Sequence, residues 1–377
     1  MPDPYLLTPG PLTTSATVRQ AMLHDWGSRD AAFVAMNRRV RERLVSLAGG
    51  EGTHVCVPVQ GSGTFAVEAA IGTLVPRAGK LLVLVNGAYG RRMVQIARVI
   101  GRACASIETA EDTPVSPDGL DRALAADGAI SHVAVVHCET TSGILNPVEA
   151  VASVCARHGR RLLIDAMSAF GALPLDARET AFDAVMASAN KCLEGVPGMG
   201  FVIMRRSSLA AAEGNAHSLS LDLFAQWRGF EQNEQWRFTP PTHVVAAFDQ
   251  ALDEHAAEGG VAGRGARYRR NMQILLDGMS KFGFVSLLPA ALQAPIIATF
   301  RMPADRNFTF DVFYDGLRRR GYVIYPGKLT VAESFRVGCI GRLGETEIRG
   351  ALAAVGEVLA EMGVRSGAPH QPEGMVA

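Results

Sequence analysis

An alternation of buried-type strands with helices most constrains the fold of this 377-residue chain. Apolar runs suited to strands lie at 54–59, 80–85, 132–137 and 161–164, and helical patterns fall between them. Continuously apolar strands separated by helices are typical of a parallel sheet with helices on both faces. We therefore predict an α/β fold built on a mostly parallel sheet.

Polar side chains gather where the predicted strands end. The residues at or just past these ends are Ser62, Tyr89, Thr140, Asp165 and Lys191. Ligands of open α/β sheets bind in the crevice beyond the carboxyl ends of the strands. We expect these five side chains to converge on one such crevice.

Lys191 lies between two apolar runs, 182–187 and 200–204, and is followed by three glycines (195, 198 and 200) and a proline. Burial disfavours a charged amine, so a lysine packed against strands loses its proton more readily than a solvated one. A neutral amine is what a Schiff base needs. A lone lysine in a glycine-rich loop is still weak evidence, and its context has to decide.

Residues 60–64 (Gln-Gly-Ser-Gly-Thr) join a predicted strand to an apolar helix predicted at 65–74. Free N–H groups and the dipole at a helix start favour an anion there, and Ser62 and Thr64 add hydroxyl donors. The spacing is neither that of a P-loop nor that of a dinucleotide-binding motif. The simpler alternative is a tight turn with Ser62 as helix N-cap.

A lysine, an aspartate, an aromatic ring and a Ser/Gly/Thr turn together match the requirements of pyridoxal 5′-phosphate. Lys191 would bond to the cofactor aldehyde, and Asp165 would pair with the pyridinium nitrogen and keep it protonated. Tyr89 would pack on the ring, and the turn at 60–64 would hold the phosphate. We predict a pyridoxal-phosphate enzyme with Lys191 and Asp165 as its catalytic residues.

Composition argues against several other classes. Lys plus Arg and Asp plus Glu both total 37, so no net charge favours nucleic acid or an anionic membrane. No apolar run approaches the length of a membrane span, and the N-terminus lacks the features of a signal peptide. The six cysteines are far apart and the nine histidines show no metal-ligand spacing. We expect a cytoplasmic protein with no metal, nucleic-acid or membrane partner.

The chain also resembles the class V branch of the fold-type I aminotransferases. The resemblance rests first on residues 165–171 and 188–191 and extends from about the first ten residues to roughly residue 341. Further matching stretches are 7–11, 60–64, 139–143, 218–223, 237–243 and 335–338. The stretches 218–223 and 237–243 favour the members that transaminate 2-aminoethylphosphonate with pyruvate in phosphonate catabolism.

The resemblance implies a role for each matching position. The cofactor would be bound by Ser62, Gly63, Thr64, Tyr89, Thr140, Asp165, Ser188 and Lys191, together with Thr239 of a second subunit. Gly10 and Arg336 would bind the substrate, and Arg336 would take its anionic end. The resemblance implies a homodimer with active sites at the interface. The loop Trp26–Asp30 would influence substrate preference if it lines the pocket.

The order of the predicted elements indicates two domains and two terminal segments. We expect an N-terminal arm at 1–15 that reaches the active site, a large cofactor-binding domain at 16–250, a smaller C-terminal α/β domain at 251–365 and a disordered tail at 366–377. Two alternatives stay open. One is an alanine–glyoxylate or serine–pyruvate transaminase, which shares the cofactor motifs. The other is a non-catalytic protein that binds pyridoxal phosphate.

Overall fold

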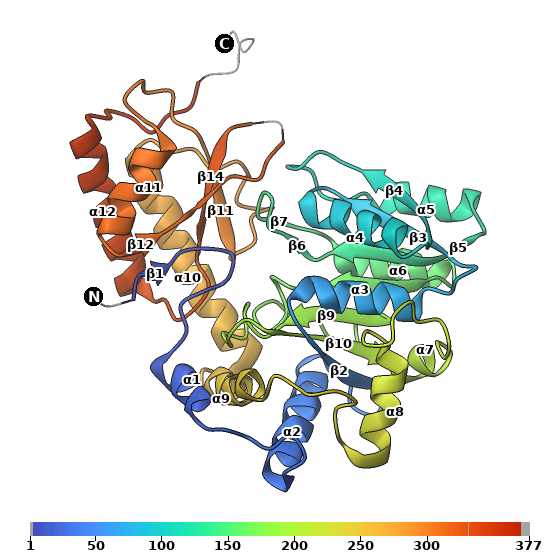
Figure 1. Ribbon diagram of the computed structural model, residues 1–377. Coiled ribbons are helices and arrows are strands. Elements are labelled where there is room, and N and C mark those ends of the chain that lie inside the picture. Colours follow the sequence, from blue (N-terminus) through green and yellow to red (C-terminus); the bar gives the residue numbers. More distant parts are fainter. Residues whose placement is uncertain (1–2, 331, 371–377) are drawn as a thin grey trace.

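The computed structural model describes residues 3–330 and 332–370. Its main sheet has seven strands in the order β2–β10–β9–β8–β5–β3–β4 (Figure 1). These strands are β2 (His54–Gln60), β3 (Lys80–Val85), β4 (Ala103–Glu108), β5 (Ile130–Val136), β8 (Arg161–Asp165), β9 (Ala184–Ser188) and β10 (Met199–Arg205). Strand β10 pairs antiparallel with both of its neighbours, and the other adjacent pairs are parallel. The predicted α/β fold with a mostly parallel sheet is confirmed.

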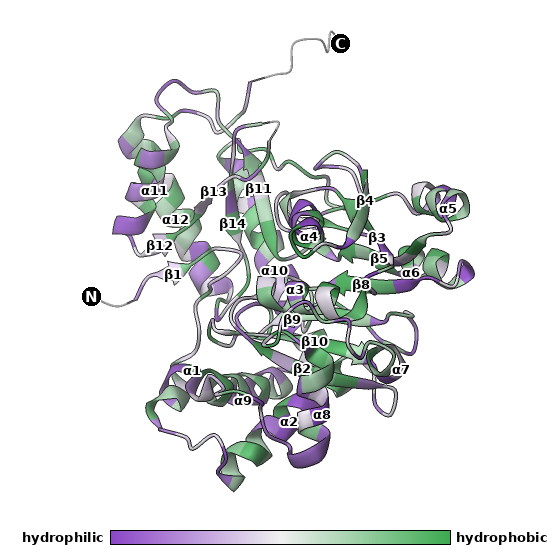
Figure 2. Ribbon diagram, turned by 45° about the vertical axis from the view of Figure 1, so that its right-hand side comes forward, coloured by the Kyte–Doolittle hydropathy of each residue, from purple (hydrophilic) through white to green (hydrophobic). Residues whose placement is uncertain are grey.

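Helices cover both faces of this sheet. They are α1 (Ala16–Gln20), η1 (Ala21–Leu23), α2 (Ala31–Leu47), α3 (Gly63–Leu74), α4 (Ala88–Val99), α5 (Pro117–Ala126), α6 (Val148–Arg157), α7 (Arg206–Ala210), α8 (Leu223–Asn233) and α9 (Thr242–Ala257). Strand side chains alternate between the faces. Leu82 and Leu84 therefore join the core under α2, α5 and α6, whereas Leu81 and Val83 join the core under α3 and α4. Hydrophobic residues dominate β8 and β10 at the centre (Figure 2).

The start of α6 differs from what its sequence pattern indicates. Residues 146–149 (Asn-Pro-Val-Glu) are typical of a helix with Asn146 as cap and Pro147 as first residue, but Pro147 is the N-cap and makes no side-chain capping bond. The Asn146 amide is already engaged: its Oδ1 accepts from Asn86 and from the Val115 amide, and its Nδ2 donates to the Val136 carbonyl. Asn146 thus joins β3, β5 and the loop before α5 instead of capping a helix.

A smaller α/β unit follows the main sheet. It contains α10 (Gly260–Lys281), β11 (Ile297–Arg301), α11 (Phe310–Arg319), β12 (Tyr322–Val323), β13 (Tyr325–Pro326), β14 (Ser334–Gly338) and α12 (Glu345–Met362). Strands β11, β14 and β13 form one antiparallel sheet. Phe335 at its centre packs against Phe284 and Phe300 at ring distances of 5.5 and 5.6 Å. Helix α10 leads from α9 into this unit (Figure 1).

The N-terminal segment crosses from the small unit to the large sheet. Strand β1 (Tyr5–Leu6) pairs in parallel with β12, and the chain then continues to Pro9 and Gly10 beside Lys191. A two-stranded ribbon, β6 (Cys138–Glu139) with β7 (Ile144–Leu145), lies just after β5. The arm and this ribbon therefore both approach the carboxyl ends of the sheet strands.

The proposed domain limits stay a prediction. The boundary at 250/251 falls inside α9, and Glu258 and Gly259 separate this helix from α10. Residues at the start of the expected tail are attached to the small unit: Gly367 N donates to Phe282 O, and Ala368 O accepts from Ala304 N. The rest of that tail, 371–377, lies outside the described residues.

Candidate active site

A cavity of about 300 Å³ lies where the strands of the main sheet end. Nine of the predicted site residues line it: Gly10, Ser62, Gly63, Thr64, Tyr89, Thr140, Asp165, Ser188 and Lys191. They come from the arm, from the turns after β2, β3, β5 and β9, and from the ends of β8 and β9. The crevice that strand topology predicted is therefore present, and two of the predicted residues, Thr239 and Arg336, do not line it.

Lys191 stands three residues beyond the end of β9, with its amine in the cavity wall. Nζ donates to the Pro9 carbonyl at 2.5 Å, so the N-terminal arm fixes where the amine lies. Burial lowers the pKa of this amine, as the sequence reasoning expected. Gly10 is needed here, because a Cβ at that position would come within 2.8 Å of Nζ and its φ is +120°.

Asp165 closes β8 and is buried. Its Oδ1 accepts one hydrogen bond, 3.0 Å long, from the Met167 amide. Burial, helped by nearby Glu139, raises its pKa to about 6. No cationic side chain of the described residues pairs with it within 4.0 Å. A buried carboxylate without a cation fits a ligand that brings its own N–H⁺ group.

The turn before α3 is open for an anion. Ser62 is the N-cap of this helix, yet its hydroxyl makes no capping bond, so the simpler N-cap alternative does not account for it. Gly63 has no room for a side chain, since a Cβ would lie 2.3 Å from Met167 Sδ. The Thr64 hydroxyl accepts from Arg92 Nη1 at 3.2 Å. Free helix amides, a hydroxyl and a nearby guanidinium suit a phosphate group.

Tyr89 sits at the start of α4, held by the two-stranded ribbon. Glu139 Oε2 accepts from the amides of Tyr89 and Gly90 at 3.1 and 3.3 Å, and Thr141 Oγ1 accepts from the Ala88 amide. Burial would raise the pKa of the Tyr89 phenol, but the positive charges of Lys191 and of Lys328 outweigh it and the pKa is lowered. The ring therefore lies in a cationic surrounding at the cavity wall.

Arg336 lies on β14, behind the cavity wall, and is 2 % exposed. Nη1 donates to the Thr140 carbonyl and Nε to the Pro326 carbonyl, both at 3.0 Å. No carboxylate of the described residues pairs with it within 4.0 Å, and burial lowers its pKa. A buried cation held only by carbonyls can take an anionic partner. Its link to Thr140 places it next to the residues that line the cavity.

The other predicted positions lie elsewhere in this chain. Thr239 is exposed and does not line the cavity, as a residue contributed to a second subunit would be. The loop at 26–30 is also absent from the lining; Trp26 instead packs against the core and against His24. Direct influence of this loop on the chain's own cavity is therefore not seen.

Two residues near the cavity received no specific role from the sequence, and a third, Arg92, is one of three arginines that the sequence offers as candidates for anion contact. Arg92 lines the cavity and lies one turn after Tyr89 on α4, a spacing that could have indicated the same helix face. Glu139 follows β5 closely and is fully buried. A single acidic residue directly after an apolar strand could have indicated this burial. Lys328 lies with Nζ 3.4 Å from the Tyr89 hydroxyl, in a segment with no sequence signal that we recognise.

The cavity as built fits pyridoxal 5′-phosphate. It offers an amine of lowered pKa, a buried carboxylate without a cation and an open helix start, which match the aldehyde, ring nitrogen and phosphate of that group. Within the described residues, no group of three or more His, Cys, Asp or Glu side chains could hold a metal ion. No helix in this part of the chain has the length and apolar character needed to span a membrane.

Comparison with known proteins agrees with this geometry. Residues 15–309 match the model of the family described as Aminotransferase class-V. A 2-aminoethylphosphonate–pyruvate transaminase of Burkholderia lata is 59% identical over 96% of both chains, and one of Pseudomonas entomophila is 58% identical over 96% of this chain and 98% of its own. The resemblance seen in the motifs is confirmed.

Solved structures show the same fold. An alanine–glyoxylate aminotransferase from Nostoc superposes with a TM-score of 0.89 at 25% identity, covering 95% of this chain and 96% of its own. A ureidoglycine–glyoxylate aminotransferase from Bacillus subtilis gives a TM-score of 0.88 at 21% identity, covering 96% and 94%. The chain belongs to the class-V aminotransferase family.

Proposed function

We propose that this aminotransferase moves the amino group of 2-aminoethylphosphonate to pyruvate, giving phosphonoacetaldehyde and L-alanine. The observation that carries the proposal is the 59% identity, along 96% of the chain, to a relative that bears this activity in its name. Pyridoxal 5′-phosphate is the cofactor of the family and supplies an aldehyde for the amine and a ring that stores electrons. The residues of this chain supply binding, orientation and proton transfer.

Lys191 is the proposed attachment point of the cofactor and the base of the reaction. Its amine has a lowered pKa, so a larger fraction is neutral and can accept a proton near neutral pH. Once free, Nζ would take the proton from the substrate carbon that bears nitrogen and hold it for return, and the bound cofactor would supply the electron sink for this proton transfer. The Pro9 carbonyl orients Nζ for this movement.

Asp165 is proposed to face the ring nitrogen. A carboxylate with a pKa of about 6 in the empty protein becomes fully ionised when an N–H⁺ group lies beside it. This ion pair keeps the ring nitrogen protonated, which the electron-storing step requires. Tyr89, Thr140 and Ser188 are the remaining proposed contacts of the ring, and Ser62, Gly63 and Thr64 those of the phosphate.

Arg336 is the proposed anchor for the anionic end of both substrates. Its guanidinium can form two parallel hydrogen bonds with a carboxylate or with a phosphonate, so pyruvate and 2-aminoethylphosphonate can use the same group. Lys328 adds a second positive charge at the Tyr89 side of the cavity. This suits a phosphonate, whose charge exceeds that of a carboxylate when it is fully ionised. Gly10 is the proposed backbone contact of the substrate.

A homodimer with shared sites is part of the proposal. Phe65, Leu219 and Phe238 are exposed hydrophobic residues. Two of them, Phe65 and Phe238, line a groove of about 300 Å³ between β2 and the start of α8. Thr239 follows Phe238 directly, so a second copy covering this groove could bring its Thr239 to the phosphate turn, where Phe65 lies three residues after Ser62. Sedimentation of the wild type and of Phe238→Glu tests this, and a monomeric wild type would contradict it.

A cytoplasmic location completes the proposal. All six cysteines are free thiols, and five of them are buried. This state is typical of proteins in a reducing compartment. Cell fractionation with activity assays checks it, and activity confined to a periplasmic or secreted fraction would refute it.

Product analysis tests the proposed reaction. The enzyme, loaded with pyridoxal 5′-phosphate, is incubated with 2-aminoethylphosphonate and pyruvate, and L-alanine and phosphonoacetaldehyde are quantified by chromatography and phosphorus NMR. We expect the two products in equal amounts. Parallel reactions contain L-serine or glycine as donor and glyoxylate as acceptor. Products only in those reactions would assign the protein to another transaminase group.

A further inference from the structure

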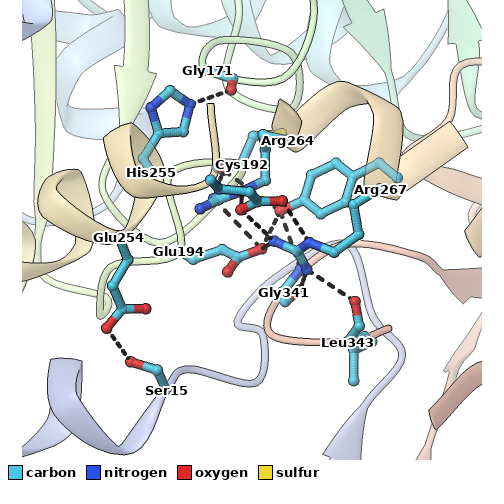
Figure 3. Close-up of polar contacts among 12 residues, drawn as sticks. Ser15, Gly171, Cys192, Glu194, Glu254, His255, Arg264, Arg267, Gly341 and Leu343 are labelled. Atoms are coloured by element: carbon cyan, nitrogen blue, oxygen red, sulfur yellow. Dashed lines mark hydrogen bonds and ion pairs between the residues drawn. The ribbon is translucent and has the colours of Figure 1, made fainter. Parts of the chain in front are cut away.

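A cluster of four charged side chains, formed by Glu194, Glu258, Arg264 and Arg267, joins the chain just after Lys191 to the start of α10 (Figure 3). Arg267 pairs with Glu194 at 2.7 Å and with Glu258 at 2.7 Å, and Arg264 pairs with Glu258 at 2.6 Å. Two positive and two negative charges therefore balance. Glu194 and Arg264 are 3 % and 1 % exposed and lie 3.5 Å apart, so this pair is shielded from solvent and salt, whereas Glu258 and Arg267 are half-buried.

The cluster holds the loop that carries Lys191. The Tyr268 hydroxyl donates to Glu194 Oε1 at 2.6 Å, and Arg264 Nη1 donates to the carbonyl of Cys192 at 2.5 Å. The Glu194 amide in turn donates to the Lys191 carbonyl at 2.8 Å. Glu194 has a φ of +60°, which is uncommon for a residue other than glycine. Its buried side-chain bonds hold it in this conformation.

The same cluster holds the chain segment that follows the Arg336 strand. Arg267 Nη1 donates to the carbonyls of Gly341 and Leu343 at 2.6 and 2.9 Å (Figure 3). The Tyr268 hydroxyl accepts from the Gly341 amide at 3.3 Å. Two adjacent residues of one helix thus bind both the loop with the reactive amine and the end of the segment that carries the proposed substrate anchor.

We propose that Glu194, Arg267 and Tyr268 are positioning residues for transamination, and that they fix the Lys191 loop relative to the Arg336 strand. The inference rests on the proposed function for the roles of Lys191 and Arg336. Rates depend steeply on such placement, because a shift of about 1 Å between reacting groups can slow a reaction roughly 100-fold. None of the three residues lines the cavity itself, so their effect on the reaction is indirect.

A purely structural role is the competing explanation, and the chain offers a control for it. Asp249 on α9 is buried and pairs with the exposed Arg39 of α2 at 2.5 Å, an ion pair outside the Lys191 loop. Asp249→Asn should lower the melting temperature as Glu194→Gln does. Only substitutions of Glu194, Arg267 or Tyr268 should change the conformation of the loop that carries Lys191.

The experiment compares Tyr268→Phe, Glu194→Gln and Asp249→Asn with the wild type. The first readout is hydrogen exchange, by mass spectrometry, of the peptide containing the Glu194 and Gly195 amides, in protein with and without cofactor. These amides donate to Lys191 O and Ala189 O. The second is the single-turnover rate constant with the amine that reacts fastest with the wild type. In Tyr268→Phe and Glu194→Gln we expect hydrogen exchange about tenfold faster than in the wild type and a single-turnover rate constant about 10- to 100-fold lower. In Asp249→Asn we expect the exchange rate and the single-turnover rate constant to stay within about twofold of the wild type.

Two results would overturn the inference. One is that Tyr268→Phe, the mildest variant, exchanges and reacts at the wild-type rates. This result would overturn the inference even if Glu194→Gln fails to fold. The other is an equal effect of Asp249→Asn on both readouts. If the wild type does not react with 2-aminoethylphosphonate but reacts with another amine, only the proposed substrate is refuted. The comparisons of hydrogen exchange and of single-turnover rate then still apply with that amine.

Discussion

Replacing Asp165 by Asn should stabilise the cofactor-free protein while abolishing its use of the cofactor. The carboxylate is 5 % exposed and has one backbone donor, the Met167 amide, which an asparagine Oδ1 can keep. The change therefore removes a buried charge and little else. In the loaded enzyme the same charge is proposed to hold the protonated ring nitrogen, so activity should fall by several orders of magnitude.

The size of the stabilisation follows from the pKa of Asp165, which burial raises from 3.8 to about 6. Below pH 3.8 the folded and unfolded states both carry the proton, and the residue has no net effect. Between 3.8 and about 6 the folded state binds the proton more tightly, so stability falls as pH rises. Above about 6 the full cost, about 3 kcal/mol, is present. For a chain of this length that is about 4 °C in melting temperature.

Thermal unfolding of both cofactor-free proteins, at one fixed protein concentration, measures this difference. At pH 8 we expect Asp165→Asn to melt about 4 °C above the wild type. The gap should narrow steadily as the pH is lowered towards 5. A variant that melts at or below the wild-type temperature at pH 8, or a gap that is independent of pH, would refute the reasoning.

Three further substitutions test other contacts. Arg336→Ala should lower kcat/KM for 2-aminoethylphosphonate about 100-fold or more while leaving the cofactor absorption band in place; loss of the band instead would count against a substrate role. Gly10→Ala, which adds a Cβ within 2.8 Å of Lys191 Nζ at a φ of +120°, should reduce the single-turnover rate about tenfold, and an unchanged rate would show that the arm does not orient the amine. Asn146→Ala leaves buried partners unpaired, so unfolding free energy should drop by about 3 kcal/mol in denaturant titrations; a drop below about 1 kcal/mol would contradict this.

The sequence predicted the parts of the fold and site that depend on local patterns. Continuous apolar runs identified β2, β3, β5 and β8, and the rule that ligands bind at strand ends brought Asp165 and Lys191 to one cavity. The pattern at the start of α6 wrongly indicated Asn146 as the helix cap. The side-chain amide of this residue instead binds partners at the end of β3 and in β5. Such long-range bonds leave no mark in the spacing of nearby residues.

Residues that act through distant contacts were beyond sequence reasoning. Glu139 lies in a motif that the sequence singled out, but its bonds to the α4 amides follow from the placement of β6 beside that helix. Glu194 and Arg267 are 73 positions apart, and neither carries a recognisable pattern. The role proposed for Thr239 requires a second subunit, and the order of residues in one chain does not place such a subunit.

The most direct test of the central claim is the half-reaction of the loaded enzyme with single amines. The cofactor absorption band is followed by stopped flow after mixing with 2-aminoethylphosphonate, L-alanine, L-serine or glycine. We predict rapid loss of the initial band with 2-aminoethylphosphonate and with L-alanine, none with the other two, and no such band in Lys191→Ala. Conversion by serine or glycine without a response to 2-aminoethylphosphonate would contradict the proposed substrate, and the absence of any band in the wild type would contradict the proposed cofactor site.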